Sequence, residues 1–197
     1  MAEASVSRDA GMTLAELMVA MAVTSVVMVL ATAGIVGMYR TTNRADVLSS
    51  EMTQLQTAFQ LLDRSVRYAT AISQPNATAT SAGDWYVEWS SDAGTTTVCS
   101  QLRLDAASGL LQRRSEQTAG QPTGWTTVAS FLVPAAPFTL QSASTSGYPH
   151  QRLTVDVTVR PSAGSSQLAR RSQFSFTALN TSLATASAGV CSDMGRP

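Results

Sequence analysis

The residues that could do chemistry at the N-terminus are a glycine and a carboxylate that precede a long apolar segment. Gly11 ends a short polar leader, and Glu16 follows five positions later. From Leu17 to Met38 no side chain is charged, and these 22 residues make about 33 Å of helix, which matches a hydrocarbon core of about 30 Å. A carboxylate one turn into a membrane helix is costly, so Glu16 is a candidate functional residue that needs a partner.

This N-terminal segment resembles the cleavage and methylation motif of type IV prepilins, in the stretch GMTLAELMV from Gly11 to Val19. In that family a dedicated peptidase cuts after the glycine, here Gly11, and the new N-terminal residue, here Met12, is N-methylated. The resemblance implies that Glu16 helps to recruit and align subunits in a filament. Two features depart from the family: Met12 stands where Phe is usual, and the proline often found about two-thirds along the membrane segment is missing.

The same residues make physical sense as a device that sets the register between subunits. Cleavage after Gly11 would create an α-amine a few residues from Glu16. When helices pack side by side in lipid, that amine can neutralise the Glu16 carboxylate of a neighbour where water cannot. The pairing helps only if the subunits are staggered so that amine and carboxylate meet.

A plain signal-anchor helix is the alternative interpretation. Thr13 and Glu16 also have the spacing of a capping box, and an acid in the first turn is favoured by the helix dipole. A conventional secretory signal fits less well, because its apolar region would be shorter than the segment from Leu17 to Met38.

Composition allows one domain plus the helix and provides no global basic field for nucleic acid. The chain has 197 residues and zero formal net charge, with 13 basic and 13 acidic residues. Its two cysteines, Cys99 and Cys191, permit one disulfide in an oxidising compartment. That bond would tie the C-terminal tail across a loop of about 90 residues and stabilise the fold by about 4 kcal/mol. Two unpaired thiols are the alternative, and no Cys/His cluster supports a metal site.

Enzyme chemistry has no support in the sequence, and no cofactor is expected. The single histidine, His150, lies in a loop, and neither a Gly-x-Ser-x-Gly motif nor a phosphate-binding glycine loop occurs. Asp84, Asp92 and Asp105 could bind calcium only if the fold gathered them, because their spacing fits no EF-hand loop. We expect them to be turn-forming residues.

Two arginine pairs and three tryptophans could instead form a patch for single-stranded DNA, since arginine with stacked aromatics suits that ligand. An arginine on the surface of a strand usually forms an ion pair with an Asp or Glu on the neighbouring strand, so nucleic acid is not expected as a partner. The residues concerned are Arg113, Arg114, Arg170, Arg171, Trp85, Trp89 and Trp125.

One long helix must carry the N-terminal motif. No Gly or Pro falls between Tyr39 and Ser73, and we predict a helix from about Thr13 to Ala71, about 90 Å long. Its first half would lie in lipid or a filament core, and its second half would pack on a sheet, with a coiled-coil dimer as the alternative. The predicted apolar stripe is Leu48, Met52, Leu55, Phe59, Leu62 and Val66, and the residues off it are Arg44, Glu51, Gln54, Asp63 and Arg67.

After a loop over 74–83, short strands with turns between them are expected. The clearest is Arg152–Arg160, where apolar and polar residues alternate as in a half-buried antiparallel strand. The tail after Asn180 is expected to be loose unless Cys191 pins it. The other predicted strands are Trp85–Ser90, Thr95–Leu104, Leu110–Ser115, Trp125–Leu132, Phe138–Gln141 and Gln167–Leu179, with turns at Asp105–Gly109 and Gln121–Gly124.

The order of these pieces resembles the minor pilins and pseudopilins of the J/W type. The similarity lies in Leu61–Ala69, Gln101–Arg113 and Leu153–Val159. Members of that group are low-copy subunits that start a pilus or a type II secretion pseudopilus and lie near its tip.

The sequence therefore predicts an α+β, pilin-like fold: a long N-terminal helix, transmembrane in its first half, packed on an antiparallel β-sheet. The expected segments are a leader (1–11), a transmembrane or filament-core helix (12–38), an amphipathic continuation (39–73), a β-rich domain (74–182) and a flexible tail (183–197).

The expected role is that of a structural subunit, not an enzyme. The chain would be a single-pass cytoplasmic membrane protein with its N-terminus in the cytoplasm and its C-terminal domain outside, or part of an extracellular filament. This orientation rests on the motif, because Arg8, Arg40 and Arg44 give no clear positive-inside signal. Expected partners are other pilin or pseudopilin subunits, prepilin peptidase, an inner-membrane assembly platform and membrane lipid. The alternatives are a tip adhesin, a DNA-binding pilin and a plain anchored envelope protein.

Overall fold

The computed structural model describes residues 12–94, 96–118, 121–160 and 169–196. The chain divides into two compact units, 1–46 and 47–197. The helix α1, Leu14–Arg67, contributes to both units. The predicted start of this helix is confirmed to within one residue. Its end comes earlier than the predicted Ala71, because Ala69–Ile72 form strand β1 and pair with the next strand.

The part of α1 in the second unit packs through the predicted apolar stripe. Leu55, Leu62 and Val66 are buried, and Phe59 is half-buried against the same core. This spacing confirms the amphipathic prediction, since residues three and four apart share one face of a helix. The Leu48, Met52, Arg44 and Glu51 side chains lie outside the described part of the chain.

The strands are all antiparallel, as predicted, and they form two sheets. A six-stranded sheet has the order β1-β2-β3-β4-β5, with β6 also paired to β4, and a three-stranded sheet has the order β7-β8-β9. The strands of the first sheet after β1 are β2 (Trp85–Ala93), β3 (Thr96–Asp105), β4 (Leu110–Thr118), β5 (Gln121–Pro122) and β6 (Thr126–Ala129). Those of the second are β7 (Phe138–Gln141), β8 (Arg152–Val159) and β9 (Arg170–Thr177).

Three local predictions have different outcomes. The turn at Asp105–Gly109 is confirmed, since the Gly109 amide donates to the Asp105 carbonyl at 2.9 Å. The turn predicted over Gln121–Gly124 is wrong in its first half, where Gln121 and Pro122 pair with β4. In β8 every second residue is buried, which confirms the predicted alternation.

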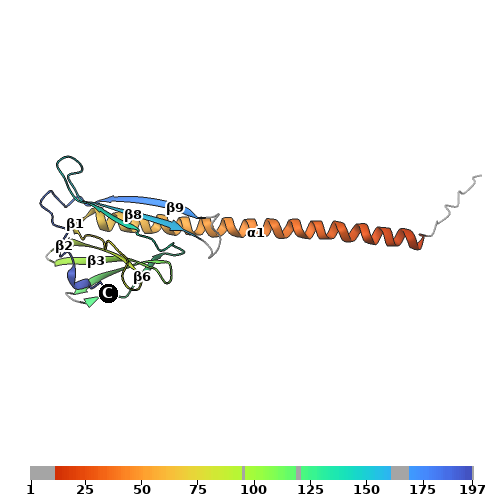
Figure 1. Cartoon of the computed structure of the whole chain (residues 1–197), viewed down its shortest axis with the longest axis horizontal. Helices are drawn as coiled ribbons and strands as arrows, with labels where there is room; N and C mark the ends of the chain where they lie inside the picture. Colours follow the sequence, from red (N-terminus) through yellow and green to blue (C-terminus); the bar gives the residue numbers. More distant parts are fainter. Residues whose placement is uncertain (1–11, 95, 119–120, 161–168, 197) are drawn as a thin grey trace, which may run out of the picture. The chain divides into compact units, whose positions relative to one another are not determined.

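The C-terminal half of α1 contacts both sheets (Figure 1). On the β2 side, Trp89 Nε1 donates to Ser65 Oγ at 2.9 Å. On the β9 side, the Phe59 ring lies 5.0 Å from the Phe174 ring and 5.2 Å from the Phe176 ring, measured between centroids. The two sheets therefore share one core, in which this part of the helix is the common partner.

The C-terminal segment packs against the six-stranded sheet, and the condition named for a tail that is not loose, a bond through Cys191, is met. The short 3₁₀ helix η2, Ser192–Met194, lies against β3, and Met194 is 2 % exposed. The pairing of Cys191 was the one sequence signal for this packing, because the Ala/Ser/Gly-rich composition of the segment gives no periodic pattern.

Candidate functional site

The N-terminal motif forms a capping box at the start of α1. The Glu16 amide donates to Thr13 Oγ1 at 3.3 Å, and the Thr13 amide donates to Glu16 Oε2 at 3.2 Å. Thr13 Oγ1 also lies 3.3 Å from the same carboxylate oxygen. These bonds satisfy amide groups that a helix start leaves unpaired. Within the described residues Glu16 Oε1 makes no hydrogen bond, so the carboxylate keeps one oxygen for another donor.

The helix behind this motif is apolar on all sides. The segment Leu14–Asn43 contains an 18-residue stretch with a mean hydropathy of 2.3, and it is long and apolar enough to cross a membrane. Its large apolar side chains are between 42 % exposed, at Val36, and 76 % exposed, at Leu14 and Met38. A helix that is apolar all round requires a cover of lipid or of other apolar helices.

The hydroxyl groups of this segment are satisfied inside the helix. Thr24, Ser25 and Thr32 each donate to the carbonyl four residues earlier, at 2.7 Å. Hydroxyls bonded in this way need no water, which suits a hydrocarbon environment.

Comparison with known proteins bears on the same segment. Residues 6–32 match the family model of the prokaryotic N-terminal methylation motif. The chain is type IV prepilin-like. The family model covers the N-terminal motif and part of the apolar helix of this prepilin-like chain, while no curated protein and no solved structure matches the chain. Gly11 and the leader 1–11 lie outside the described residues, and Met12, the first described residue, is 71 % exposed.

In the second unit of the prepilin-like chain, a disulfide joins Cys99 on β3 to Cys191, with the Cα atoms 5.7 Å apart. Cys191 comes directly before η2 and has a left-handed backbone conformation with φ of 54°. The bond therefore holds the C-terminal segment on the six-stranded sheet.

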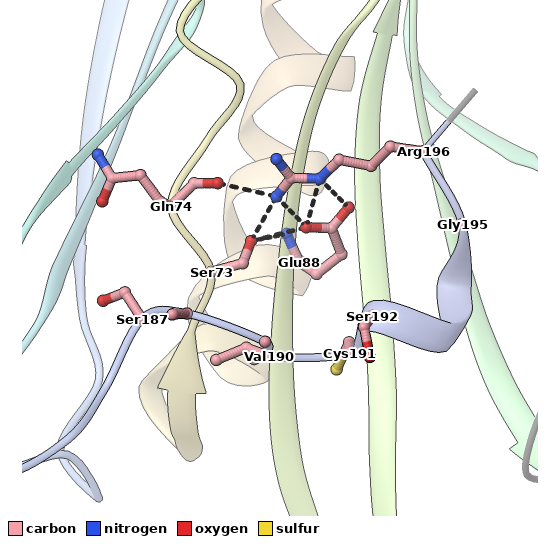
Figure 2. A pocket seen from close by; sticks show the side chains of 11 residues that line it. Ser73, Gln74, Glu88, Ser187, Val190, Cys191, Ser192, Gly195 and Arg196 are labelled. Atoms are coloured by element: carbon pink, nitrogen blue, oxygen red, sulfur yellow. Dashed lines mark hydrogen bonds and ion pairs between the residues drawn. The ribbon is translucent and has the colours of Figure 1, made fainter.

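Beside this disulfide, a buried carboxylate and an arginine form an ion pair (Figure 2). Glu88 on β2 is 2 % exposed, and Arg196 donates to both of its carboxylate oxygens. Ser73 Oγ donates to Glu88 Oε2 at 2.7 Å, and Gln101 Nε2 donates to Oε1 at 2.7 Å. Four donors thus satisfy this buried carboxylate, as burial of a charge requires.

These residues surround a cavity of about 400 Å³ between β2 and the segment Ser187–Arg196. The Glu88 carboxylate and the Arg196 guanidinium are bonded to each other and to Ser73, as Figure 2 shows. Because these charged groups are already paired, the arrangement has the character of a structural network and not of a reactive site. The sequence analysis did not predict this network. The available signal was Glu88 between two large apolar residues, Val87 and Trp89, and in the structure both of these are fully buried.

The residues considered for a DNA patch are brought together only in part. Arg114 lies over the Trp125 ring at 4.4 Å, but the two arginine pairs lie in separate parts of the fold. The pair Arg113-Arg114 lies on β4 and the pair Arg170-Arg171 on β9, in different sheets, and Trp89 is fully buried. Arg171 pairs with Asp156 of the neighbouring strand, which is the expected default for a strand arginine. Hydrogen bonding from Arg171 lowers the pKa of the Asp156 carboxyl, although desolvation acts in the opposite direction.

Two of the three aspartates considered for calcium share an arginine: Arg103 lies 3.8 Å from Asp84 Oδ2 and 3.6 Å from Asp105 Oδ2. Asp84 accepts the Ala106 amide at 2.9 Å, Asp105 accepts the Ala107 amide at 3.0 Å, and Asp92 accepts the Thr97 hydroxyl at 3.2 Å. No cluster of three potential metal ligands occurs among the described residues. Asp105 serves a turn, as the sequence indicated, whereas Asp92 lies within β2 and Asp84 is buried against Tyr86.

The remaining titratable candidates are used locally. His150 Nδ1 lies 2.6 Å from the Thr181 carbonyl oxygen. Burial raises the pKa of the Tyr86 hydroxyl, which donates to Asp84 Oδ2 at 3.1 Å. These contacts are structural, and they bring no nucleophile together with a base.

Proposed function

We propose that this chain is a structural subunit, a minor pilin or pseudopilin, of a type IV pilus-like or type II secretion-like filament. In this proposal a prepilin peptidase cuts after Gly11, Met12 becomes the N-methylated first residue, and Glu16 pairs with the α-amine of a neighbouring subunit.

One observation carries the proposal: the match to the methylation motif, residues 6–32, extends into a helix whose apolar side chains are exposed all round. A plain anchor needs only the apolar surface. A chain that leaves the membrane as part of a filament must exchange lipid for neighbouring helices, and it then needs a device that fixes their register.

The capping box is compatible with this role. The Thr13 amide donates to Glu16 Oε2, and Oε1 accepts no hydrogen bond from residues 12–94, 96–118, 121–160 or 169–196. An amine at Met12 of a neighbour would add a charge-assisted hydrogen bond, which is stronger than a neutral one. The cap would then orient the carboxylate that the neighbour uses.

The second unit supports an extracytoplasmic position for the C-terminal domain. A disulfide between Cys99 and Cys191 persists in an oxidising compartment and is rare in the cytosol. With the leader in the cytoplasm, the helix would cross the membrane once. The proposed partners are other pilin or pseudopilin subunits, prepilin peptidase, the inner-membrane assembly platform and membrane lipid.

The first test is the N-terminal mass of the membrane-extracted protein, expressed with and without a prepilin peptidase. Processing predicts a mature chain that begins at methylated Met12 only when the peptidase is present. A Gly11→Arg variant, which replaces the small residue before the cut by a bulky one, should keep the leader and serve as the control. An intact leader on the unmodified chain in the presence of the peptidase would contradict the proposal and favour a plain anchor.

A further inference from the structure

Arg113 is a half-buried arginine, and only some of its N–H groups have hydrogen-bond partners among the described residues. It lies on β4, and its Nη2 donates to Ser65 Oγ at 3.3 Å and to Ser100 Oγ at 3.2 Å. Its Nε is buried and has no hydrogen-bond partner among the described residues. Its guanidinium carbon lies 5.9 Å from the centre of the Trp89 ring, which offers some cation–π attraction but no acceptor for the N–H.

Acidic side chains do not compensate this charge within the described residues. The ion pairs of this part of the chain involve Arg67, Arg103, Arg171 and Arg196, and none of them includes Arg113. Burial lowers the pKa of the Arg113 guanidinium, although an arginine in a protein remains protonated. A partly desolvated charge without a counter-charge is unfavourable, and the buried, unbonded Nε of Arg113 calls for an explanation.

The space next to Arg113 holds a second arginine. A cavity of about 520 Å³ is lined by Thr57, Gln60, Leu61, Arg64, Ser65 and Arg113, with no acidic residue among them. Arg64 forms no ion pair or side-chain hydrogen bond with another described residue. An adjoining cavity of about 180 Å³ shares Leu61 and Arg113 and adds the polar residues Arg114, Ser115 and Thr123.

We propose that this cavity between α1 and β4 is an oxyanion-binding site that takes a carboxylate or phosphate group between Arg64 and Arg113. Planar guanidinium groups match the oxygens of such anions with two parallel donors, and Ser65 adds a hydroxyl. An anion here would accept from the guanidinium groups and supply the counter-charge that Arg113 lacks. The site does not depend on the filament proposal, because all of its residues lie in the second unit.

The test is an NMR titration of the full-length chain in a neutral detergent, following the arginine side-chain N–H signals. Sodium phosphate and sodium acetate are added separately, with sodium chloride at the same ionic strength as the reference. We expect a saturable shift of the Arg113 and Arg64 signals, with a Kd of about 1 mM or tighter for the preferred anion, as two or three charge-assisted bonds supply. Which anion binds more tightly distinguishes a phosphate ligand from a carboxylate ligand.

Variants decide whether the response comes from this site. Arg64→Gln, on the exposed side of the helix, and Arg113→Gln should each weaken binding about tenfold or more. Arg152→Gln is the matched control, since it removes the same charge from β8, where Arg152 lies over the Tyr148 ring at 4.0 Å. If Arg113→Gln fails to fold, Arg64→Gln still tests the site. Equal binding in Arg64→Gln and the unmodified chain, or a response to phosphate and acetate no larger than to chloride, would overturn the proposal.

Discussion

Arg196 donates a hydrogen bond to the carboxylate of Glu88, 108 residues earlier in the sequence (Figure 2). The Glu88 side chain extends from β2 and is buried under the C-terminal segment. The Arg196 Nε lies 2.9 Å from Oε1 and 3.0 Å from Oε2. The same guanidinium donates to Ser73 Oγ at 2.9 Å and to the Gln74 carbonyl at 2.8 Å. The pair thus fastens the last described residues to the start of the β-rich unit.

Replacing Arg196 by Gln should therefore destabilise the chain strongly, because the Glu88 side chain, 3 % exposed, would remain buried and charged. We expect the free energy of unfolding to fall by about 2–4 kcal/mol, measured by chemical denaturation of the full chain in detergent. The double variant Glu88→Gln/Arg196→Gln should recover part of the loss. Arg67→Gln, which breaks the exposed pair with Asp63, should have little effect. An Arg196→Gln variant as stable as Arg67→Gln would contradict this account.

The disulfide should contribute separately to the same attachment. Cys99 and Cys191 are 92 residues apart, and in the chain-entropy model a loop of that length stabilises by about 4 kcal/mol. Reduction should lower the denaturation midpoint of the unmodified chain toward that of a Cys99→Ser/Cys191→Ser variant. The variant itself should not respond to the reductant. A midpoint that is the same with and without reductant, while thiol titration shows the bond to be broken, would disprove the stabilising role.

A third prediction concerns the turn between β3 and β4. Gly109 has φ of +64°, and a Cβ added there would lie 2.7 Å from the Leu132 carbonyl oxygen. Gly109→Ala combines left-handed strain with a backbone clash, and we expect it to cost about 2–3 kcal/mol in denaturation experiments. Gly124→Ala is the control, since no described atom lies within 4 Å of its added Cβ. Equal stability of the two variants would show that the turn relaxes freely.

The elements that could be predicted are those whose signal is local. The apolar stripe of α1, which includes Leu55, Phe59, Leu62 and Val66, has spacings of four and three residues, as expected for one face of a helix. In β8, from Leu153 to Val159, every second residue is buried, as expected for a strand. The capping and methylation motif is equally local, so the sequence alone predicts the capping bonds of Glu16.

The features that were missed depend on contacts distant in sequence. The residues of β1 follow a segment with a helical pattern, and part of them was predicted to be helical. They adopt an extended conformation because Ile72 pairs with Trp89 in β2. The partner of Glu88 is a single arginine in a segment without periodicity. The cavity at Arg113 is formed by β4 and α1, where Arg113 donates to Ser65, 48 residues earlier in the sequence. No window of sequence contains both sides of such a contact.

The Asp156–Arg171 pair predicts a pH dependence on the three-stranded sheet. Arg171 Nε donates to Asp156 Oδ1 at 2.8 Å, and this bond lowers the Asp156 pKa below its usual 3.8. A carboxyl with a lowered folded-state pKa contributes stability above its unfolded pKa, and this contribution is lost as pH falls through the lowered value. Arg171→Gln should therefore differ from the unmodified chain above pH about 4, and the difference should vanish in stronger acid.

An NMR titration of the Asp156 carboxyl carbon measures this effect directly. Its pKa should rise toward the usual value in Arg171→Gln and stay unchanged in Arg170→Gln, the neighbouring arginine of β9. An unchanged Asp156 pKa in Arg171→Gln would show that the pair does not form in solution.

The last prediction separates the two roles of Glu16. A glutamine at the third helical position can still close a capping box, whereas an alanine cannot, and neither carries charge. If Glu16 only caps α1, Glu16→Gln should behave as the unmodified chain and Glu16→Ala alone should lower helix stability. If its charge pairs with a neighbour's amine, both variants should insert and be cleaved but enter filaments poorly. Filament incorporation, measured by shearing and immunoblotting in a cell that assembles the chain, decides between these outcomes. Normal incorporation of Glu16→Gln would leave the capping bonds to Thr13 as the whole function of this residue.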